Sequence, residues 1–285
     1  MRPLLAAVAL LLPTPAEAQN YRCTAVPNSN PILSQAWNQR CLPYFISNNG
    51  ALLDGPDRRL LIDQSFSVWT TPACTDLHFM DFGYTDQAPG FNANRTDNEN
   101  IIISIEDEPT ANIFFTRNEL AITVTSFNTA TGEIFDADIM INAFRFRFDE
   151  VQSVPACQGG DTPLPYDLRN TLVHEIGHFI GFEHDPDEES TMYASAPECE
   201  VKKRDLTQDN ITGVCNVYGV GEPTRTCAPP DTYDKGPGNP KLFRDQCNPD
   251  EARTGCGCTA TERSSISAWW WLLGAMLILR RISGR

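Results

Sequence analysis

The chain has 285 residues, of which 41% are hydrophobic, enough for one sizeable buried core with extensions at both ends. Its formal net charge is −15, which disfavours binding to nucleic acid, because a phosphate backbone attracts Lys and Arg. The same charge disfavours electrostatic docking on an anionic membrane surface. Composition alone therefore favours a soluble, acidic, secreted protein.

Residues 1–18 have the three parts of a signal peptide. Arg2 supplies the positive start, residues 4–12 form a short apolar stretch, and Ala16-Glu17-Ala18 is a small-x-small cleavage site. The apolar stretch is too short to span a bilayer. We expect the mature chain to begin at Gln19 and to be exported.

Residues 19–219 carry the periodicity of one compact domain. Short apolar or alternating runs predict strands at 36–47, 77–84, 100–105, 120–127 and 134–142. Apolar residues at helical spacing predict helices at 57–69, 166–180 and 206–218. Asp57 and Thr207 are the expected N-caps of the first and last helix. Turn residues at 128–132 predict a hairpin between the last two strands, and 86–100 is expected to be a long loop.

The segment 174–185 carries the candidate chemistry and reads His-Glu-Ile-Gly-His-Phe-Ile-Gly-Phe-Glu-His-Asp. A helix places His174 and His178 on one face, where both can bind one ion. Gly181 allows a sharp exit from the helix, which brings His184 round as a third ligand. Three protein ligands leave one position of a tetrahedral zinc open, as catalytic zinc sites require.

Glu175, next to the first ligand, is the expected general base, which takes a proton from a zinc-activated water and passes it to the leaving amine. The alternative is a buried amphipathic helix whose histidines only satisfy hydrogen bonds in the core. Three of the four histidines of the chain lie in this motif at fixed offsets from Gly181, which favours the zinc site.

With these residues the chain resembles the metzincin clan of zinc endopeptidases and, within it, the matrixins. Met192, in Ser190-Thr191-Met192-Tyr193, matches the clan's turn beneath the metal, in which the Met packs without binding zinc. The resemblance covers most of 36–219 and implies an α+β zincin-like fold with a twisted, five-stranded mixed sheet and three helices. It also implies an endopeptidase that hydrolyses extended polypeptides.

The resemblance implies a substrate-binding strand as well. Ala121, Ile122 and Thr123 lie where matrixins have an antiparallel edge strand that pairs with extended substrate. An unpaired edge offers its backbone groups to a peptide. The alternative is an edge strand that the rest of the protein covers.

The chain also departs from the matrixin pattern. His78 is the one histidine outside the motif, so the second, structural zinc of matrixins is expected to be absent. Asp185 is typical of adamalysins, and Ala194 stands where astacins and serralysins place a Tyr ligand. Calcium is possible at a set of acidic residues, although solvated surface charge is favoured for them. These residues are Asp86, Asp97, Glu106, Asp107, Asp136 and Asp138.

Ten cysteines suit an exported, disulfide-bonded protein. Their spacing suggests two local pairs, Cys199 with Cys215 and Cys227 with Cys247. Cys23 is expected in a disulfide, because its neighbours do not match the cysteine switch that keeps matrixins latent.

Residues 220–255, rich in Pro, Gly, Asp and Thr, are expected to form a linker. Residues 256–285 contain Cys256-Gly257-Cys258, an apolar run at 266–279 and a final Arg cluster. As a helix the run spans about 21 Å, short for a hydrocarbon core of about 30 Å. The segment resembles a Myxo-CTERM sorting tail, which implies transient membrane association, a processing protease, and display on or release from the cell surface. An ordinary tail anchor is the alternative.

The expected function is zinc-dependent hydrolysis of peptide bonds. One alternative is a zinc-binding surface or adhesion protein with vestigial chemistry, but a binding site alone needs no general base such as Glu175. A second alternative is a structural envelope protein that uses the fold as a rigid module.

Overall fold

The computed structural model describes residues 21–30, 32–95, 97–116, 118–159 and 162–221, and the statements below concern these residues. The expected signal peptide, most of the linker, the Cys227–Cys247 pair and the tail lie outside them. Within the described ranges no helix is long and apolar enough to cross a bilayer.

Most described strands belong to one twisted sheet, in the order β1-β6-β4-β2-β3, with β5 also paired to β6. Its strands are β1 (Ala36–Trp37), β2 (Cys41–Ser47), β3 (His78–Thr85), β4 (Ile101–Ser104), β5 (Ala121–Phe127) and β6 (Glu133–Ile141). β5 runs antiparallel to β6, whereas the other pairs in this sheet are parallel. A separate parallel pair joins β7 (Phe148–Asp149) to β8 (Tyr166–Asp167).

The sheet has six strands rather than the expected five, because the run at 36–47 is divided. β1 pairs with β6, whereas β2 pairs with β3 and β4, so the two segments occupy different places in the sheet. The hairpin of β5 and β6 is confirmed, with Ala121 opposite Ile141 and Thr123 opposite Ile139. The described residues between β3 and β4 form a loop without helix or strand, as their composition predicted.

Five α-helices are described, two more than expected. They are α1 (Pro56–Val68), α2 (Glu108–Phe114), α3 (Val154–Gln158), α4 (Leu168–Phe179) and α5 (Gln208–Val217). The added helices are short, and each begins with a side-chain N-cap, Asp107 or Ser153, and a Pro in the first turn. Thr207 caps α5 as expected, but Gly55 rather than Asp57 precedes α1, because Pro56 occupies its first turn.

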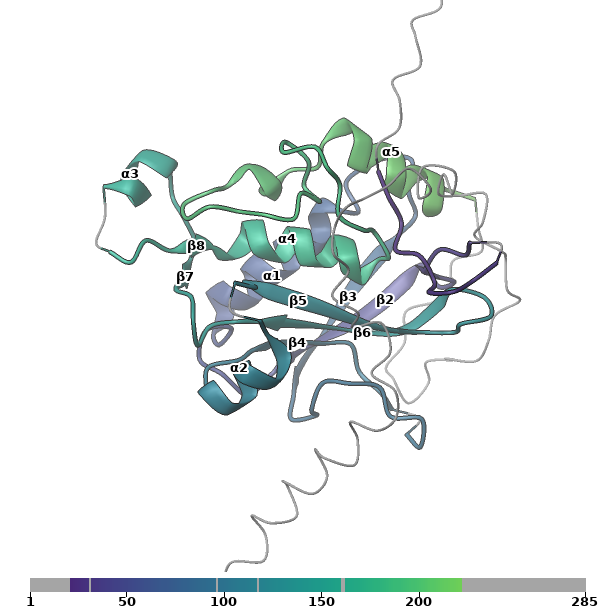
Figure 1. Ribbon diagram of the computed structural model, residues 1–285, viewed down its shortest axis with the longest axis horizontal. Coiled ribbons are helices and arrows are strands. Elements are labelled where there is room, and N and C mark those ends of the chain that lie inside the picture. Colours follow the sequence, from purple (N-terminus) through teal and green to yellow (C-terminus); the bar gives the residue numbers. More distant parts are fainter. Residues whose placement is uncertain (1–20, 31, 96, 117, 160–161, 222–285) are drawn as a thin grey trace, which may run out of the picture.

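The sheet separates two hydrophobic cores. Because side chains alternate along a strand, Ile102 of β4 faces the larger core, whereas Ile101 and Ile103 face the smaller one. The larger core also contains Leu172 and Ile176 of α4, and the smaller contains Ala111 of α2. Figure 1 shows the same arrangement, with α1 and α4 on one side of the sheet and α2 on the other.

The described disulfides join distant segments and correct the local pairing suggested by spacing. Cys199 is bonded to Cys157, and Cys215 is bonded to Cys74, so the Cys199–Cys215 prediction was wrong. The fold brings each true pair together, with Cα–Cα distances of 5.8 Å for Cys157–Cys199 and 5.2 Å for Cys74–Cys215.

Candidate active site

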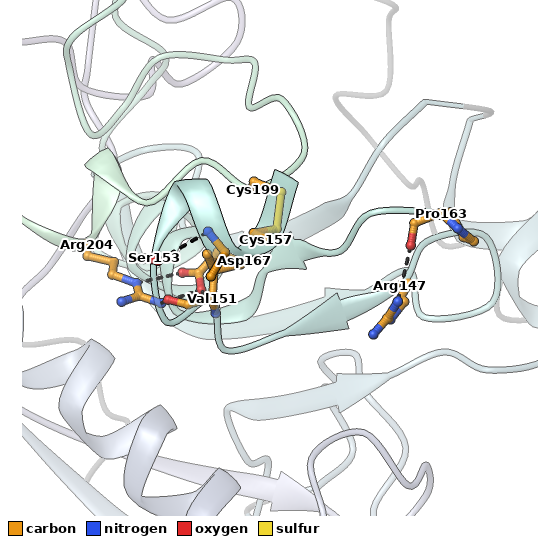
Figure 2. The surroundings of a disulfide bond; sticks show 9 residues. Arg147, Val151, Ser153, Cys157, Pro163, Asp167, Cys199 and Arg204 are labelled. Atoms are coloured by element: carbon orange, nitrogen blue, oxygen red, sulfur yellow. Dashed lines mark hydrogen bonds and ion pairs between the residues drawn. A yellow bond between two sulfur atoms is a disulfide. The ribbon is translucent and has the colours of Figure 1, made fainter. Parts of the chain in front are cut away.

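Helix α4 begins at a buried, charged cap. The carboxylate of Asp167 accepts a hydrogen bond of 2.7 Å from the backbone N–H of Asn170, and it also contacts the guanidinium of Arg204. The Arg204 side chain donates as well to the carbonyl oxygen of Val151, and the Cys157–Cys199 bond lies beside this cap (Figure 2). These contacts anchor the start of the helix that carries the candidate site.

The chain leaves α4 in a sharp turn at Gly181, as the sequence predicted. Gly181 has a φ of +90°, and a Cβ at this position would lie only 2.3 Å from the carbonyl oxygen of Gln35. A residue with a side chain would therefore meet both strain and a clash with backbone. The turn returns His184 to the helix, where its Nε2 lies 3.1 Å from Nε2 of His178.

The structure brings the three predicted histidines together. One ring nitrogen each of His174, His178 and His184 can be chosen so that all lie within 4.8 Å of one another. Two nitrogens bound to one tetrahedral zinc, at about 2.0–2.1 Å each, lie about 3.3 Å apart. The 3.1 Å between His178 and His184 therefore fits a shared zinc ion.

Backbone carbonyls fix two of the rings. Nδ1 of His174 lies 2.7 Å from the carbonyl oxygen of Thr191, and Nδ1 of His178 lies 2.7 Å from that of Phe182. With Nδ1 donating, Nε2 is left unprotonated for a metal. Burial lowers the pKa of both histidines and lowers that of His184 to about 4, so the neutral, metal-binding form is favoured.

Glu175 lies next to His174 on α4, and only 5% of its surface is exposed. Its Oε2 accepts a hydrogen bond of 2.7 Å from the hydroxyl of Thr123 on β5. Burial raises the pKa of Glu175 to about 7, although the hydrogen bond from Thr123 opposes this effect. A carboxyl group with this pKa can exchange a proton near neutral pH.

Met192 is buried and packs against α4. A Cβ on Gly177 of the helix would lie 2.2 Å from Met192 Sδ, so the helix and this turn are in close contact. The carbonyl oxygen of Met192 accepts a hydrogen bond of 3.0 Å from the backbone N–H of Asp185. The turn thus supports the helix and is also bonded to the loop that carries the third histidine.

A cavity opens in front of the three histidines and Glu175. The residues that line it include Ala121, Ile122 and Thr123 of β5 and residues 194–196 after the Met turn. β5 has a partner strand, β6, on one side only within the described chain. The side chains of these three β5 residues are half-buried.

Sequence reasoning missed several residues around the cavity. Lys203 and Thr24 line it, and Trp69 donates its indole N–H to the carbonyl oxygen of Val173 at 2.9 Å. The N-terminal segment pairs with the loop between the second and third histidine, through Thr24 N–H to the carbonyl oxygen of Gly181 at 2.8 Å. No local pattern marks these residues, because each contact joins segments far apart in the sequence.

The other candidate sites have different outcomes. His78 begins β3, is exposed and lies outside the three-histidine group. Solvated surface charge was the wrong interpretation for Asp136 and Asp138, which are each 1% exposed. The Asp138 carboxylate accepts hydrogen bonds from the backbone N–H groups of Gly90 and Ile101 and thereby fixes the loop before β4.

Comparisons with known proteins identify the family of the chain. The family model described as Matrixin matches residues 36–219, which is more than half of the chain. Metalloendoproteinase 1 of Glycine max is 42% identical over 55 residues, 19% of this chain and 18% of that protein. Metalloendoproteinase 1-MMP of Arabidopsis thaliana is 40% identical over 60 residues, 21% of this chain and 16% of that protein.

A third relative, neutrophil collagenase of Homo sapiens, is 31% identical over 83 residues, 26% of this chain and 18% of that protein. The chain therefore spans less than a fifth of the length of these relatives. The family match covers residues 121–123 and 194–196 at the cavity, the three histidines and Met192. The chain belongs to the matrixin family.

Proposed function

We propose that this chain hydrolyses peptide bonds of extended polypeptides at one zinc ion held by His174, His178 and His184, with Glu175 as general base. The observation that carries the proposal is the convergence of three histidine ring nitrogens within 4.8 Å, beside a buried carboxylate at the same cavity. A zinc ion in such a site supplies Lewis acidity, which acidifies a water and polarises a carbonyl group.

The side chains of the protein supply the proton transfer. Glu175 is positioned to accept the proton of the attacking water and to return it to the amine that leaves. Burial raises the pKa of Glu175 to about 7, which favours uptake of a proton by this carboxylate. The carbonyl contacts at Nδ1 of His174 and His178 hold those rings in a ligand orientation.

The outer edge of β5 at Ala121, Ile122 and Thr123 is the proposed substrate-binding segment. Ala121, Ile122 and Thr123 border the cavity, and the edge opposite β6 can donate and accept backbone hydrogen bonds. An extended peptide that pairs there lies across the cavity beside Glu175. Recognition through backbone groups suits an endopeptidase, because it does not depend on a chain terminus.

We further propose the domain division 1–18 signal peptide, 19–219 peptidase domain, 220–255 linker and 256–285 sorting tail. It rests on the composition of the flanking segments and on the family match at 36–219. The expected outcome is a secreted or surface-displayed peptidase whose tail associates transiently with the membrane. Comparing the mass of the protein in the medium with that of the full chain tests both processing steps.

The function is tested with the full, oxidised chain, zinc-loaded and incubated with a mixed peptide library. We expect internal cleavage that a chelator abolishes and added zinc restores. His178→Ala should lose both zinc and cleavage, whereas His78→Ala, a matched control outside the site, should keep both. Zinc binding without cleavage by the parent chain would favour the zinc-binding adhesion alternative, and cleavage that persists after zinc removal would refute the proposal.

A further inference from the structure

Thr123 contacts the proposed general base from the substrate-binding strand. Its hydroxyl lies 2.7 Å from Oε2 of Glu175 and 3.0 Å from the backbone carbonyl oxygen of the same residue. Thr123 lies within β5, opposite Ile139 of β6, so the strand ladder fixes the position of its backbone. As a β-branched residue it has few side-chain rotamers in a strand, which keeps the hydroxyl in place.

The contact is the one hydrogen bond that the described residues provide to the Glu175 carboxylate. Glu175 is buried, and its neighbours on α4 include the proposed ligands His174 and His178. The hydrogen bond at Oε2 restricts rotation of the carboxyl group. Oε1 has no hydrogen-bond partner among the described residues. An oriented carboxylate is what proton transfer to and from a bound substrate requires.

We propose that Thr123, given the peptidase activity proposed above, is a positioning residue that fixes the orientation of the Glu175 carboxylate. The same strand thus carries two tasks, pairing with the substrate backbone and holding the base. A substrate that pairs with β5 is thereby placed in a fixed relation to Glu175. The hydroxyl, rather than the bulk of the Thr123 side chain, is the group that matters.

Thr125 provides a matched control. It lies two residues further along β5, and its hydroxyl donates a hydrogen bond of 2.8 Å to Oε1 of Gln35 rather than to Glu175. Thr125→Val therefore removes the same group from the same strand without touching the base. Thr123→Val keeps the shape and strand propensity of Thr123 but lacks the hydroxyl, and Thr123→Ser keeps the hydroxyl.

The experiment compares kcat, KM and zinc content of these three variants in the full, zinc-loaded chain, with one library-derived peptide. We expect Thr123→Val to lower kcat by about 10-fold, part of the 10²–10⁴-fold supplied by a general base, with KM changed less than about 2-fold. Thr123→Ser should recover kcat to within about 3-fold of the parent, and Thr125→Val should keep it within about 2-fold. Zinc content should be one per chain throughout.

A second comparison separates positioning from strand packing. In a Glu175→Ala background, Thr123→Val should cause no further loss of the residual rate, because residues that act as a unit are not additive. An unchanged kcat in Thr123→Val, an equal loss in Thr123→Ser, or the same fold loss in the Glu175→Ala background would each overturn the inference. A parent chain that cleaves nothing would instead refute the proposed function.

Discussion

Gly177 and Met192 are in such close contact that a Cβ on Gly177 would lie 2.2 Å from Met192 Sδ and 2.8 Å from the Trp69 ring. The contact lies on α4 between His174 and His178, so the packing of this helix turn against Met192 depends on a residue without a side chain. Met192 is 1% exposed and cannot move into solvent without unpacking the turn.

Gly177→Ala should therefore destabilise the protein and weaken zinc binding. Overpacking a filled core costs about 1–3 kcal/mol, and the displaced turn also carries the carbonyl partner of His174, Thr191. Urea unfolding and competition with a zinc chelator measure the two effects. Gly159→Ala is the control, because its nearest contact would be 3.4 Å. Equal stability of Gly177→Ala and the parent would contradict the packing described here.

Removal of zinc should lower the stability of the folded protein. A ligand that binds only the native state at 100 times its Kd stabilises it by about 2.7 kcal/mol, which a chelator removes. We expect a clear fall in Tm of the parent chain on chelation and no fall in His184→Ala, which lacks one proposed ligand. A chelator-dependent Tm in His184→Ala equal to that of the parent would argue against His184 as a ligand.

The Cys157–Cys199 disulfide should stabilise the start of α4 and the loop after the Met turn. It closes a loop with a sequence separation of 42, for which chain-entropy estimates give about 4 kcal/mol. The double variant Cys157→Ser, Cys199→Ser should lose about 2–4 kcal/mol of unfolding free energy in urea. Reduction of the parent should shift it towards the variant, and an unchanged midpoint in the variant would show that the bond contributes little.

Lys203 predicts a specific dependence of stability on pH. Its ammonium group is buried and donates to the carbonyl oxygens of Tyr193 and Ser195, and burial lowers its pKa to about 8. The unfolded pKa is about 10.4, so between these values the unfolded chain binds more protons and stability rises with pH.

The test for Lys203 is the difference in unfolding free energy between the parent and Lys203→Met, both zinc-loaded. Raising the pH from 7 to 10 should shift this difference in favour of the parent by about 1–3 kcal/mol. Groups shared by both proteins cancel in the comparison. A difference that does not change with pH would contradict the lowered pKa of Lys203.

Local patterns predicted the parts of this structure that are local in origin. The histidine spacing and Gly181 predicted that the three histidines come together, hydrophobic periodicity predicted α1, α4 and α5, and the turn residues at 128–132 predicted the hairpin of β5 and β6. Predictions were wrong where the structure depends on contacts between residues far apart in the sequence. Cys199 bonds to Cys157 rather than to nearby Cys215, and 36–47 divides because its two halves pair with different strands.

The burial of charged side chains could not be predicted from local sequence patterns either. Asp138 stands in an acidic stretch that looks solvated, yet its carboxylate accepts the N–H groups of Gly90 and Ile101 inside the fold. The contact between Thr123 and Glu175 likewise joins residues 52 positions apart. Neither contact follows from a spacing in the sequence, because each depends on how the strands are arranged in the fold.

The most direct test of the central claim is cleavage of a mixed peptide library by the zinc-loaded full chain beside its Glu175→Gln variant. Gln keeps the size of the side chain but cannot accept a proton as a carboxylate does, so we predict one zinc per chain in both and a loss of cleavage rate of about 10²–10⁴-fold in the variant. Equal cleavage by the two proteins, with equal zinc content, would contradict the role assigned to Glu175.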